Sequence, residues 1–244
     1  MIRAFVKTVL LLLCCLLFYA PIYLTDRFNK KAWRDRMVRA CLTSILYICE
    51  IRLHITGALA TERPLLVVSN HVSYLDIPIL SSAATLSFTP KQEIAGWPIF
   101  GDVCRMAGCI FIDRKLERVK AMKERLKERL AAGDVVSLFP EATTGDGKRV
   151  LPFKSGFFNL ADEMKDGGGL YVQPVAICYR AVRNLPIDST QWPDIAWYGD
   201  MDLAPHLWKL LSLGSITVEL IFLPATTMEA HGDRKRLAAY CHDM

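Results

Sequence analysis

A histidine and an aspartate, His71 and Asp76, stand five residues apart just after the apolar run 65–68. In a regular helix five steps leave two side chains roughly 140° apart, so these two meet only if the chain bends between them. A strand-to-helix turn supplies such a bend, and Pro78 fits a helix that begins just after Asp76. An imidazole held by a carboxylate through one ring nitrogen keeps the other nitrogen free as a base near pH 7. The spacing therefore indicates either a general base with its orienting carboxylate, or a helix N-cap at Asp76 beside an ordinary turn histidine.

Charged side chains follow two further apolar runs. Arg114 comes after residues 110–112, and Glu141 comes after residues 135–139. The planar fork of an arginine suits an anionic phosphate, which it binds with two hydrogen bonds. A single residue of this kind is more often half of a structural salt bridge, but three candidate groups at successive strand ends favour a functional site.

The elements that must position these residues are those of an α/β domain. Apolar residues recur at steps of three and four from Leu116 to Leu130, with charges on the other faces, which predicts an amphipathic helix. A helix between two strands implies a right-handed parallel crossover. We therefore predict a central, mostly parallel sheet flanked by helices, with functional loops at the carboxyl ends of the strands. The predicted strands are residues 51–56, 65–68, 110–112, 135–139, 171–177 and 215–223.

The N-terminal 49 residues are predicted to meet a membrane. No charge occurs from residue 8 to residue 25, and as a helix this stretch reaches roughly 27 Å, barely the thickness of the hydrocarbon layer. Pro21 is expected to end or kink that helix early. The next segment turns from basic to apolar along its length, which suits a second helix in the head-group layer. We expect residues 1–49 to form a membrane-associated helix or a two-helix hairpin; the pattern fits both a single span and a hairpin that dips into the bilayer.

Charges around the apolar run indicate its orientation. Six cations between residues 27 and 39 follow it and favour the cytoplasm on that side. A cleaved signal peptide is the alternative, but no A-x-A-like site follows the run.

Composition excludes several classes of protein. The 244 residues are 52% hydrophobic with a mean hydropathy of +0.23, which rules out a disordered chain and suggests apolar surface facing lipid. The net charge of +5 is too small to argue for a nucleic-acid partner. None of the eight cysteines forms a C-x-x-C pair, so we expect reduced structural thiols and no metal site.

Four ordered blocks, at residues 70–76, 111–114, 139–144 and 172–175, resemble those of the glycerolipid acyltransferases. That family includes the bacterial 1-acylglycerol-3-phosphate acyltransferases. The likeness covers roughly residues 50 to 225, so it assigns residues 50–244 to an acyltransferase domain. The segment from Trp197 to Trp208 also resembles the subgroup with the lyso-ornithine-lipid acyltransferases. One departure is Ala142, where the family usually has glycine after its glutamate.

The resemblance implies roles for individual residues. The residue matching His71 deprotonates a hydroxyl of the acceptor, which attacks the thioester of acyl-CoA or acyl carrier protein, and the residue matching Asp76 orients the imidazole. No further cofactor and no acyl-enzyme are expected, and the chain contains no G-x-S-x-G motif. The implied substrate-binding residues are Arg114, Glu141, Thr143 and Pro174, with Lys91 as a further candidate cation.

Pro174 also fits a plain turn or edge strand, and Lys91 also fits a solvated surface residue. A second group of cations, Lys148, Arg149 and Lys154, suits phosphate contacts or bare surface charge equally well.

The function expected first is an O-acyltransferase at the inner (cytoplasmic) membrane, with its active site facing the cytoplasm. It would make phosphatidic acid from 1-acylglycerol-3-phosphate, using a membrane lysolipid and a thioester donor as its partners. Lyso-ornithine lipid is the alternative acceptor. A non-catalytic lipid-binding membrane protein is the alternative of another class, for which Ala142 is the support, and a serine hydrolase is a distant fourth.

Overall fold

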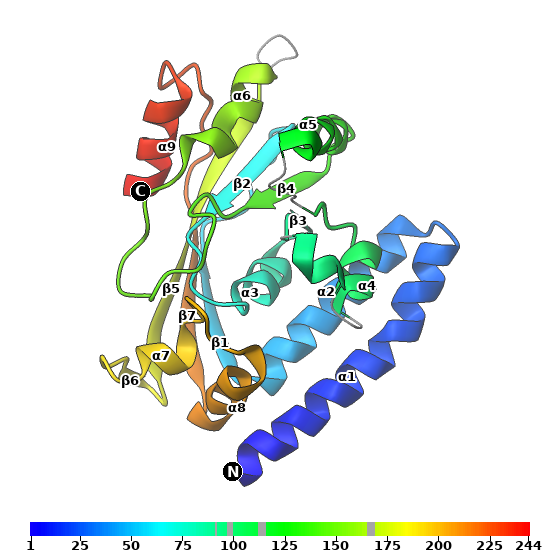
Figure 1. The fold of residues 1–244 in the computed structure, drawn as a ribbon, viewed down its shortest axis with the longest axis vertical. Helices are drawn as coiled ribbons and strands as arrows, with labels where there is room; N and C mark the ends of the chain where they lie inside the picture. Colours follow the sequence, from blue (N-terminus) through cyan, green and yellow to red (C-terminus); the bar gives the residue numbers. More distant parts are fainter. Residues whose placement is uncertain (91, 97–99, 112–115, 165–168) are drawn as a thin grey trace.

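The computed structural model describes the 244-residue chain except residues 91, 97–99, 112–115 and 165–168. Within the described residues the strands join in one sheet in the order β1-β7-β5-β2-β4-β3, with β6 paired to β5 (Figure 1). The pairs β1–β7, β5–β2, β2–β4 and β4–β3 are parallel, whereas β5 runs antiparallel to β7 and β6. The expected mostly parallel α/β sheet is therefore confirmed. The strands are β1 (Ile51–Thr56), β2 (Leu65–Ser69), β3 (Ser87–Phe88), β4 (Val135–Leu138), β5 (Tyr171–Val182), β6 (Leu185–Pro186) and β7 (Ile216–Phe222).

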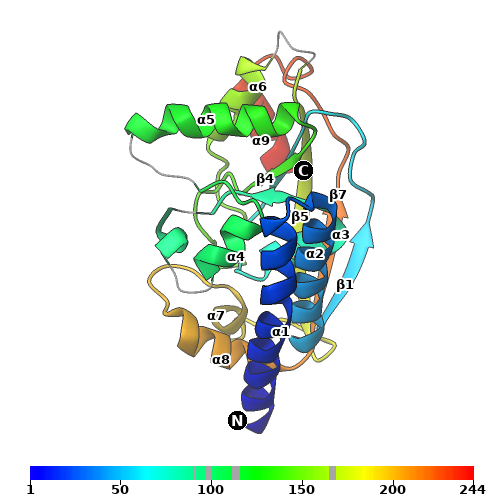
Figure 2. The ribbon, with the colours of Figure 1, turned by 90° about the vertical axis from the view of Figure 1, so that its right-hand side faces the viewer.

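Helices cover both faces of this sheet, as expected (Figures 1 and 2). The α-helices are α1 (Ile2–Arg27), α2 (Lys31–Ile48), α3 (Asp76–Ala83), α4 (Phe100–Met106), α5 (Leu116–Ala131), α6 (Asn159–Glu163), α7 (Trp192–Ile195), α8 (Leu203–Leu213) and α9 (Arg234–Asp243), and the short 3-10 helices are η1 (Gln92–Gly96) and η2 (Ser155–Phe158).

Strand β2 shows how the sequence builds the two layers. All five of its residues are buried, as expected of an apolar strand in the middle of a parallel sheet. Leu65 and Val67 enter the core shared with α3 and α8, whereas Leu66 and Val68 enter the core shared with α5 and α9. Successive side chains of a strand point to opposite faces, so one short run anchors both layers.

The predicted strand 110–112 is wrong for its described residues. Ile110 and Phe111 belong to no strand, and Ile112 lies outside the described residues. The parallel neighbour of β4 is instead β3, whose two residues pair with Val136 and Ser137. β3 occupies that edge of β4, and Ile110 joins the structure through its amide, which donates to the carbonyl oxygen of Phe88 in β3 (2.9 Å), and through its side chain, which is buried in the core with Leu66 and Val136.

The N-terminal helices form a hairpin that packs along the domain. α1 and α2 lie side by side, α1 also contacts α8, and α2 contacts α3 (Figures 1 and 2). Ala4 and Ile22, near opposite ends of α1, are buried, whereas Leu13 and Leu17 are more than half exposed. α1 therefore has one face packed on protein along its length and one apolar face left open.

Pro21 does not end α1, which continues to Arg27. Figure 1 shows α1 bending before it reaches the turn to α2. The neighbouring Ile22 is buried, and this packing keeps the helix together although proline removes one of its hydrogen bonds. Among the described helices, α1 is the one long and apolar enough to cross a bilayer, with a mean hydropathy of 2.3 over its most apolar stretch.

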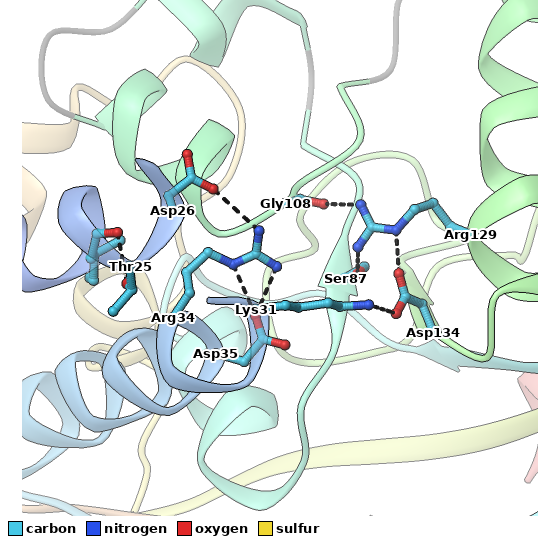
Figure 3. A network of polar contacts seen from close by, with 10 residues as sticks. Thr25, Asp26, Lys31, Arg34, Asp35, Ser87, Gly108, Arg129 and Asp134 are labelled. Carbon is cyan, nitrogen blue, oxygen red and sulfur yellow. Dashed lines mark hydrogen bonds and ion pairs between the residues drawn. The ribbon is translucent and has the colours of Figure 1, made fainter. Parts of the chain in front are cut away.

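Asp134, in the turn between α5 and β4, ties the hairpin to the domain. Its carboxylate accepts hydrogen bonds from Lys31, at the start of α2, and from Arg129 of α5 (Figure 3). Arg129 also donates to the hydroxyl of Ser87 (2.8 Å) and to the carbonyl oxygen of Gly108 (3.1 Å). Burial alone would raise the pKa of Asp134, but the hydrogen bonds from Lys31 and Arg129 outweigh it and hold that pKa below its usual range.

We predict that Asp134→Asn lowers the melting temperature at pH 7 by about 2–4 °C. Because the folded-state pKa is depressed, the contribution of the carboxylate is present above its unfolded value of about 4 and is lost as the pH falls through the folded value. The difference from wild type should therefore persist at pH 6 and shrink in acid. The exposed control Glu62→Gln should melt like wild type, and an unchanged Asp134→Asn at pH 7 would contradict the proposed tie.

Candidate active site

The loop that joins β2 to α3 leaves the sheet between β4 and β5. Asn70, the first residue after β2, forms two hydrogen bonds with the main chain of Ile177 in β5. Its Nδ2 donates to the carbonyl oxygen (2.9 Å), and its Oδ1 accepts from the amide nitrogen (2.8 Å). An amide side chain has both a donor and an acceptor, so it satisfies both main-chain polar groups of one strand residue. The start of the loop is thereby fixed to β5.

Asp76 closes the other end of the loop. It is the first residue of α3, its carboxylate is fully buried, and its Oδ2 accepts from the amides of Val72 (2.7 Å) and Ser73 (2.9 Å). The same oxygen lies 2.8 Å from Nδ1 of His71. The chain therefore makes the bend that the spacing requires, and Asp76 both satisfies free amides of the turn and holds the imidazole.

The imidazole of His71 is fixed on several sides. Its ring stacks on Phe139, with centroids 3.9 Å apart and an interplanar angle of 12°. The side chain is 19% exposed, so one edge reaches solvent. Nδ1 is occupied by Asp76, and Nε2 forms no hydrogen bond within the described part of the chain. A neutral ring in this arrangement carries its proton on Nδ1 and offers Nε2 as the base.

Glu141 braces the same loop from the end of β4. Its Oε1 accepts from the main-chain amide of His71 (2.6 Å), and its Oε2 accepts from the amide of Leu151 (2.8 Å). Burial raises the pKa of the Glu141 carboxyl, although both of these hydrogen bonds favour its charged form. The described hydrogen bonds of Glu141 therefore go to main-chain amides, and one of these amides belongs to the residue that carries the imidazole.

The remaining candidate substrate-binding residues and cations do not belong to one cluster among the described residues. Thr143 is exposed in the loop after Glu141, as are the cations Lys148, Arg149 and Lys154. Pro174 is buried within β5 opposite Val68, so it is neither a turn nor an edge-strand residue. Lys91 and Arg114 lie outside the described residues. The structure thus brings together His71, Asp76 and Glu141.

Two residues from distant segments also touch this cluster, and of these the sequence pointed to Trp197, as part of the segment 197–208, but not to Tyr179. The hydroxyl of Tyr179 in β5 donates to Oδ1 of Asp76 (2.7 Å), and the amide of Trp197 donates to the carbonyl oxygen of Val72 (3.0 Å). Both come from segments more than 100 residues along the chain from the loop they contact. Only the sheet order, with β5 beside β2, places Tyr179 there.

Ala142 adopts the left-handed backbone conformation, with φ of 62°. This conformation costs an alanine more than a glycine, because the Cβ atom crowds the following carbonyl oxygen. The departure from the family's glycine therefore stores strain directly after Glu141.

We predict that Ala142→Gly stabilises the protein by about 0.5–1 kcal/mol, as relief of the left-handed strain outweighs the added freedom of the unfolded chain. Chemical denaturation in detergent measures the difference. The matched control is Ala239→Gly, at an exposed position within α9, which should destabilise by about 0.5–1 kcal/mol. A loss of stability in both variants would show that Ala142 is unstrained.

Comparisons with known proteins agree with the motif order. Residues 50–178 match the family model Acyltransferase. The chain is 37% identical over 192 residues to a lyso-ornithine lipid O-acyltransferase of Rhizobium meliloti, covering 77% of this chain and 66% of that protein. It is 34% identical over 207 residues to a 1-acyl-sn-glycerol-3-phosphate acyltransferase of Neisseria gonorrhoeae, covering 84% of this chain and 77% of that protein.

The fold also has a solved counterpart. The crystal structure of a 1-acyl-sn-glycerophosphate acyltransferase from Thermotoga maritima superposes with a TM-score of 0.67 over 97% of this chain and 93% of that chain, at 20% identity. At this identity the likeness concerns the fold alone. The family match, by contrast, spans more than half of the chain and includes the loop from Asn70 to Asp76. The chain belongs to the acyltransferase family.

Proposed function

We propose that the chain is a lysolipid O-acyltransferase in which His71 is the general base. The acceptor hydroxyl gives its proton to Nε2 of His71 while its oxygen attacks the thioester carbonyl of acyl-CoA or an acylated carrier protein. The tetrahedral intermediate expels the thiolate, which takes the proton from the imidazolium, so the products are an ester and a thiol. The observation that carries this proposal is the 2.8 Å contact between Nδ1 of His71 and Asp76, which leaves Nε2 as the available base.

The surroundings of Asp76 support its role in this reaction. Its carboxylate is fully buried and already hydrogen-bonded by main-chain amides, so it need not reorganise when the imidazole gains a proton. A fixed negative charge beside a developing cation lowers the barrier more than a mobile one, because its orientation costs nothing during the reaction. Stacking on Phe139 limits rotation of the ring in the same way.

Further residues are proposed to bind the acceptor lysolipid. Arg114 and Lys91 are the candidate cations for an anionic head group, and Thr143 is exposed on the loop beside the base. For Glu141, its contacts support bracing of His71 rather than a primary contact with the head group. Pro174 is buried in the middle of the sheet, which supports a role in shaping β5 rather than in lining the pocket.

Lyso-ornithine lipid is the acceptor that we propose first. The relative with the higher identity of the two compared carries that name, and the segment 197–208, which resembles this subgroup, contacts the loop through Trp197 and Val72. That segment therefore lies beside the base, where an acceptor must place its hydroxyl. The second candidate is 1-acylglycerol-3-phosphate, the acceptor expected first from the motifs, and the Neisseria gonorrhoeae relative supports it.

The hairpin is proposed to hold the active site at the cytoplasmic face of the inner membrane. If α1 crossed the bilayer, α2 packed beside it would take Arg36 and Arg39 into the hydrocarbon, at about 2.5–3.5 kcal/mol for each charge near its centre. With α1 lying in one leaflet, its open apolar face meets lipid and the cations of α2 stay at the head groups. A lysolipid then reaches the site from the bilayer, and the thioester donor reaches it from water.

We predict that purified protein acylates lyso-ornithine lipid faster than 1-acylglycerol-3-phosphate, and that His71→Ala lowers kcat at least about 1000-fold on either acceptor. Release of thiol from acyl-CoA measures both rates. Membrane binding should be unchanged in His71→Ala. Activity retained in this variant would rule out the mechanism, activity on the phosphate lipid alone would reverse the order of acceptors, and no thiol release with either would leave a lipid-binding protein.

We predict that Leu13→Lys/Leu17→Lys reduces binding to lipid vesicles by tenfold or more, because each ammonium in hydrocarbon costs about 2.5–3.5 kcal/mol. Co-flotation with vesicles of bacterial lipid composition measures the bound fraction. Val150→Lys, at an exposed apolar position outside the hairpin, is the matched control and should bind as wild type does. Equal binding of all three proteins would place the open face of α1 outside the membrane.

A further inference from the structure

The buried carboxylate of Asp76 is held by two different parts of the fold. Its Oδ2 accepts from the loop itself, through the amides of Val72 and Ser73, and also faces His71. Its Oδ1 accepts from the hydroxyl of Tyr179 at 2.7 Å. Tyr179 is thus the donor to Oδ1 within the described part of the chain, and it comes from β5 rather than from the loop.

Strand β5 holds both ends of the loop, within three consecutive residues. The main chain of Ile177 hydrogen-bonds Asn70 at the start of the loop, and the side chain of Tyr179, two residues further along, hydrogen-bonds Asp76 at its end. The pairing of β5 with β7 shifts register between Tyr179 and Ala181. A bulge at this point turns the strand and re-aims its side chains, as bulges beside active sites do.

The hydroxyl of Tyr179 is suited to permanent donation. The side chain is 6% exposed and belongs to the core between the sheet and α3. Burial first, and the charge of Asp76 second, hold the pKa of Tyr179 well above its usual range. The phenol therefore stays protonated at neutral pH, and it is too enclosed to meet substrate.

We infer that Tyr179 is a positioning residue for the acyl transfer: it fixes the second oxygen of Asp76 and so sets both the angle and the basicity of the carboxylate that holds His71. This inference rests on the proposed function, because it acts through the His71–Asp76 pair. With the phenol in place, the negative charge of Asp76 is shared among several donors. Without it, the carboxylate gains proton affinity and holds the imidazolium more tightly.

The main experiment compares Tyr179→Phe with Tyr171→Phe, which removes a hydroxyl from the opposite end of the same strand. Tyr179→Phe keeps the ring and is expected to lower kcat by about 10- to 100-fold, with KM for the lysolipid within about twofold of wild type. The acid limb of the pH–rate profile should move up by about half a pH unit. Among the described residues, the other titratable groups are Glu141 beside the pair and Tyr74 beside Tyr179, with His206 of α8 reached through Tyr74, and all three are kept. Tyr171→Phe should match wild type in every respect.

A second comparison separates positioning from general support of the fold. Added to Asp76→Asn, Tyr179→Phe should cost less than about twofold in the residual rate, because its effect passes through the carboxylate. A structural role would cost the same in both backgrounds. An equal loss in both backgrounds, or a wild-type kcat with an unshifted pH profile, overturns the inference.

A tyrosine analogue and the His71→Ala variant complete the experiment. If Tyr179→Phe is not recovered folded, 3-fluorotyrosine placed at position 179 keeps the shape and donates more strongly, so the acid limb should move to lower pH; an unmoved limb overturns the inference. Retained activity in His71→Ala would remove the proposed function itself. An inactive His71→Ala beside an unaffected Tyr179→Phe would remove only the role of Tyr179.

Discussion

A buried carboxylate is the constraint on which this site depends. The carboxylate of Asp76 is not exposed to solvent, so its negative charge can be stabilised only by hydrogen-bond donors of the protein. Those donors are the amides of the loop, the phenol of Tyr179 and the imidazole of His71. To supply them the chain must bend between His71 and Asp76, and the bend is what brings the two side chains together. The need of the buried carboxylate for hydrogen-bond donors therefore determines the shape of the loop and also orients His71 as a base.

The sheet order makes that loop rigid. β2 lies between β4 and β5, so a loop that leaves its carboxyl end has a neighbour on each side. From the β4 side, Glu141 holds the amide of His71 and Phe139 stacks on its ring. From the β5 side, Ile177 holds Asn70. Such bracing favours general-base catalysis, because the imidazole is already oriented and no conformational entropy is lost during the reaction.

Much of this fold could be predicted from periodicity, and the exceptions have physical causes. β1 alternates with period two and β2 is apolar from Leu65 to Val68, so both were visible in the sequence. β3 has two residues, which is too short for any pattern, and the apolar run 110–112 took its place in the prediction. The spacing of His71 and Asp76 showed that the chain must bend for their side chains to meet, but it also fitted an N-cap at Asp76 beside an ordinary turn histidine.

Contacts between residues far apart in the chain could not be predicted from the sequence. Tyr179 lies 103 residues from Asp76, and no local pattern distinguishes it from an ordinary strand tyrosine. Glu141 was expected at a strand end as a substrate-binding residue. Which way its carboxylate faces depends on the amides of His71 and Leu151, which only the folded loop presents. The sequence showed Ala142 only as a departure from the glycine usual in the family, and its left-handed φ angle appears in the folded loop.

If Nε2 of His71 is the general base, the neutral imidazole must be the tautomer with its proton on Nδ1. Nitrogen-15 NMR of the histidine-labelled protein, with His71 identified by the resonances missing from a His71→Asn spectrum, shows which ring nitrogen carries the proton in the neutral state. The account predicts the proton on Nδ1, directed at Asp76, and a bare Nε2. A neutral ring protonated on Nε2 would contradict it, since the nitrogen facing the acceptor would then have no lone pair to accept a proton.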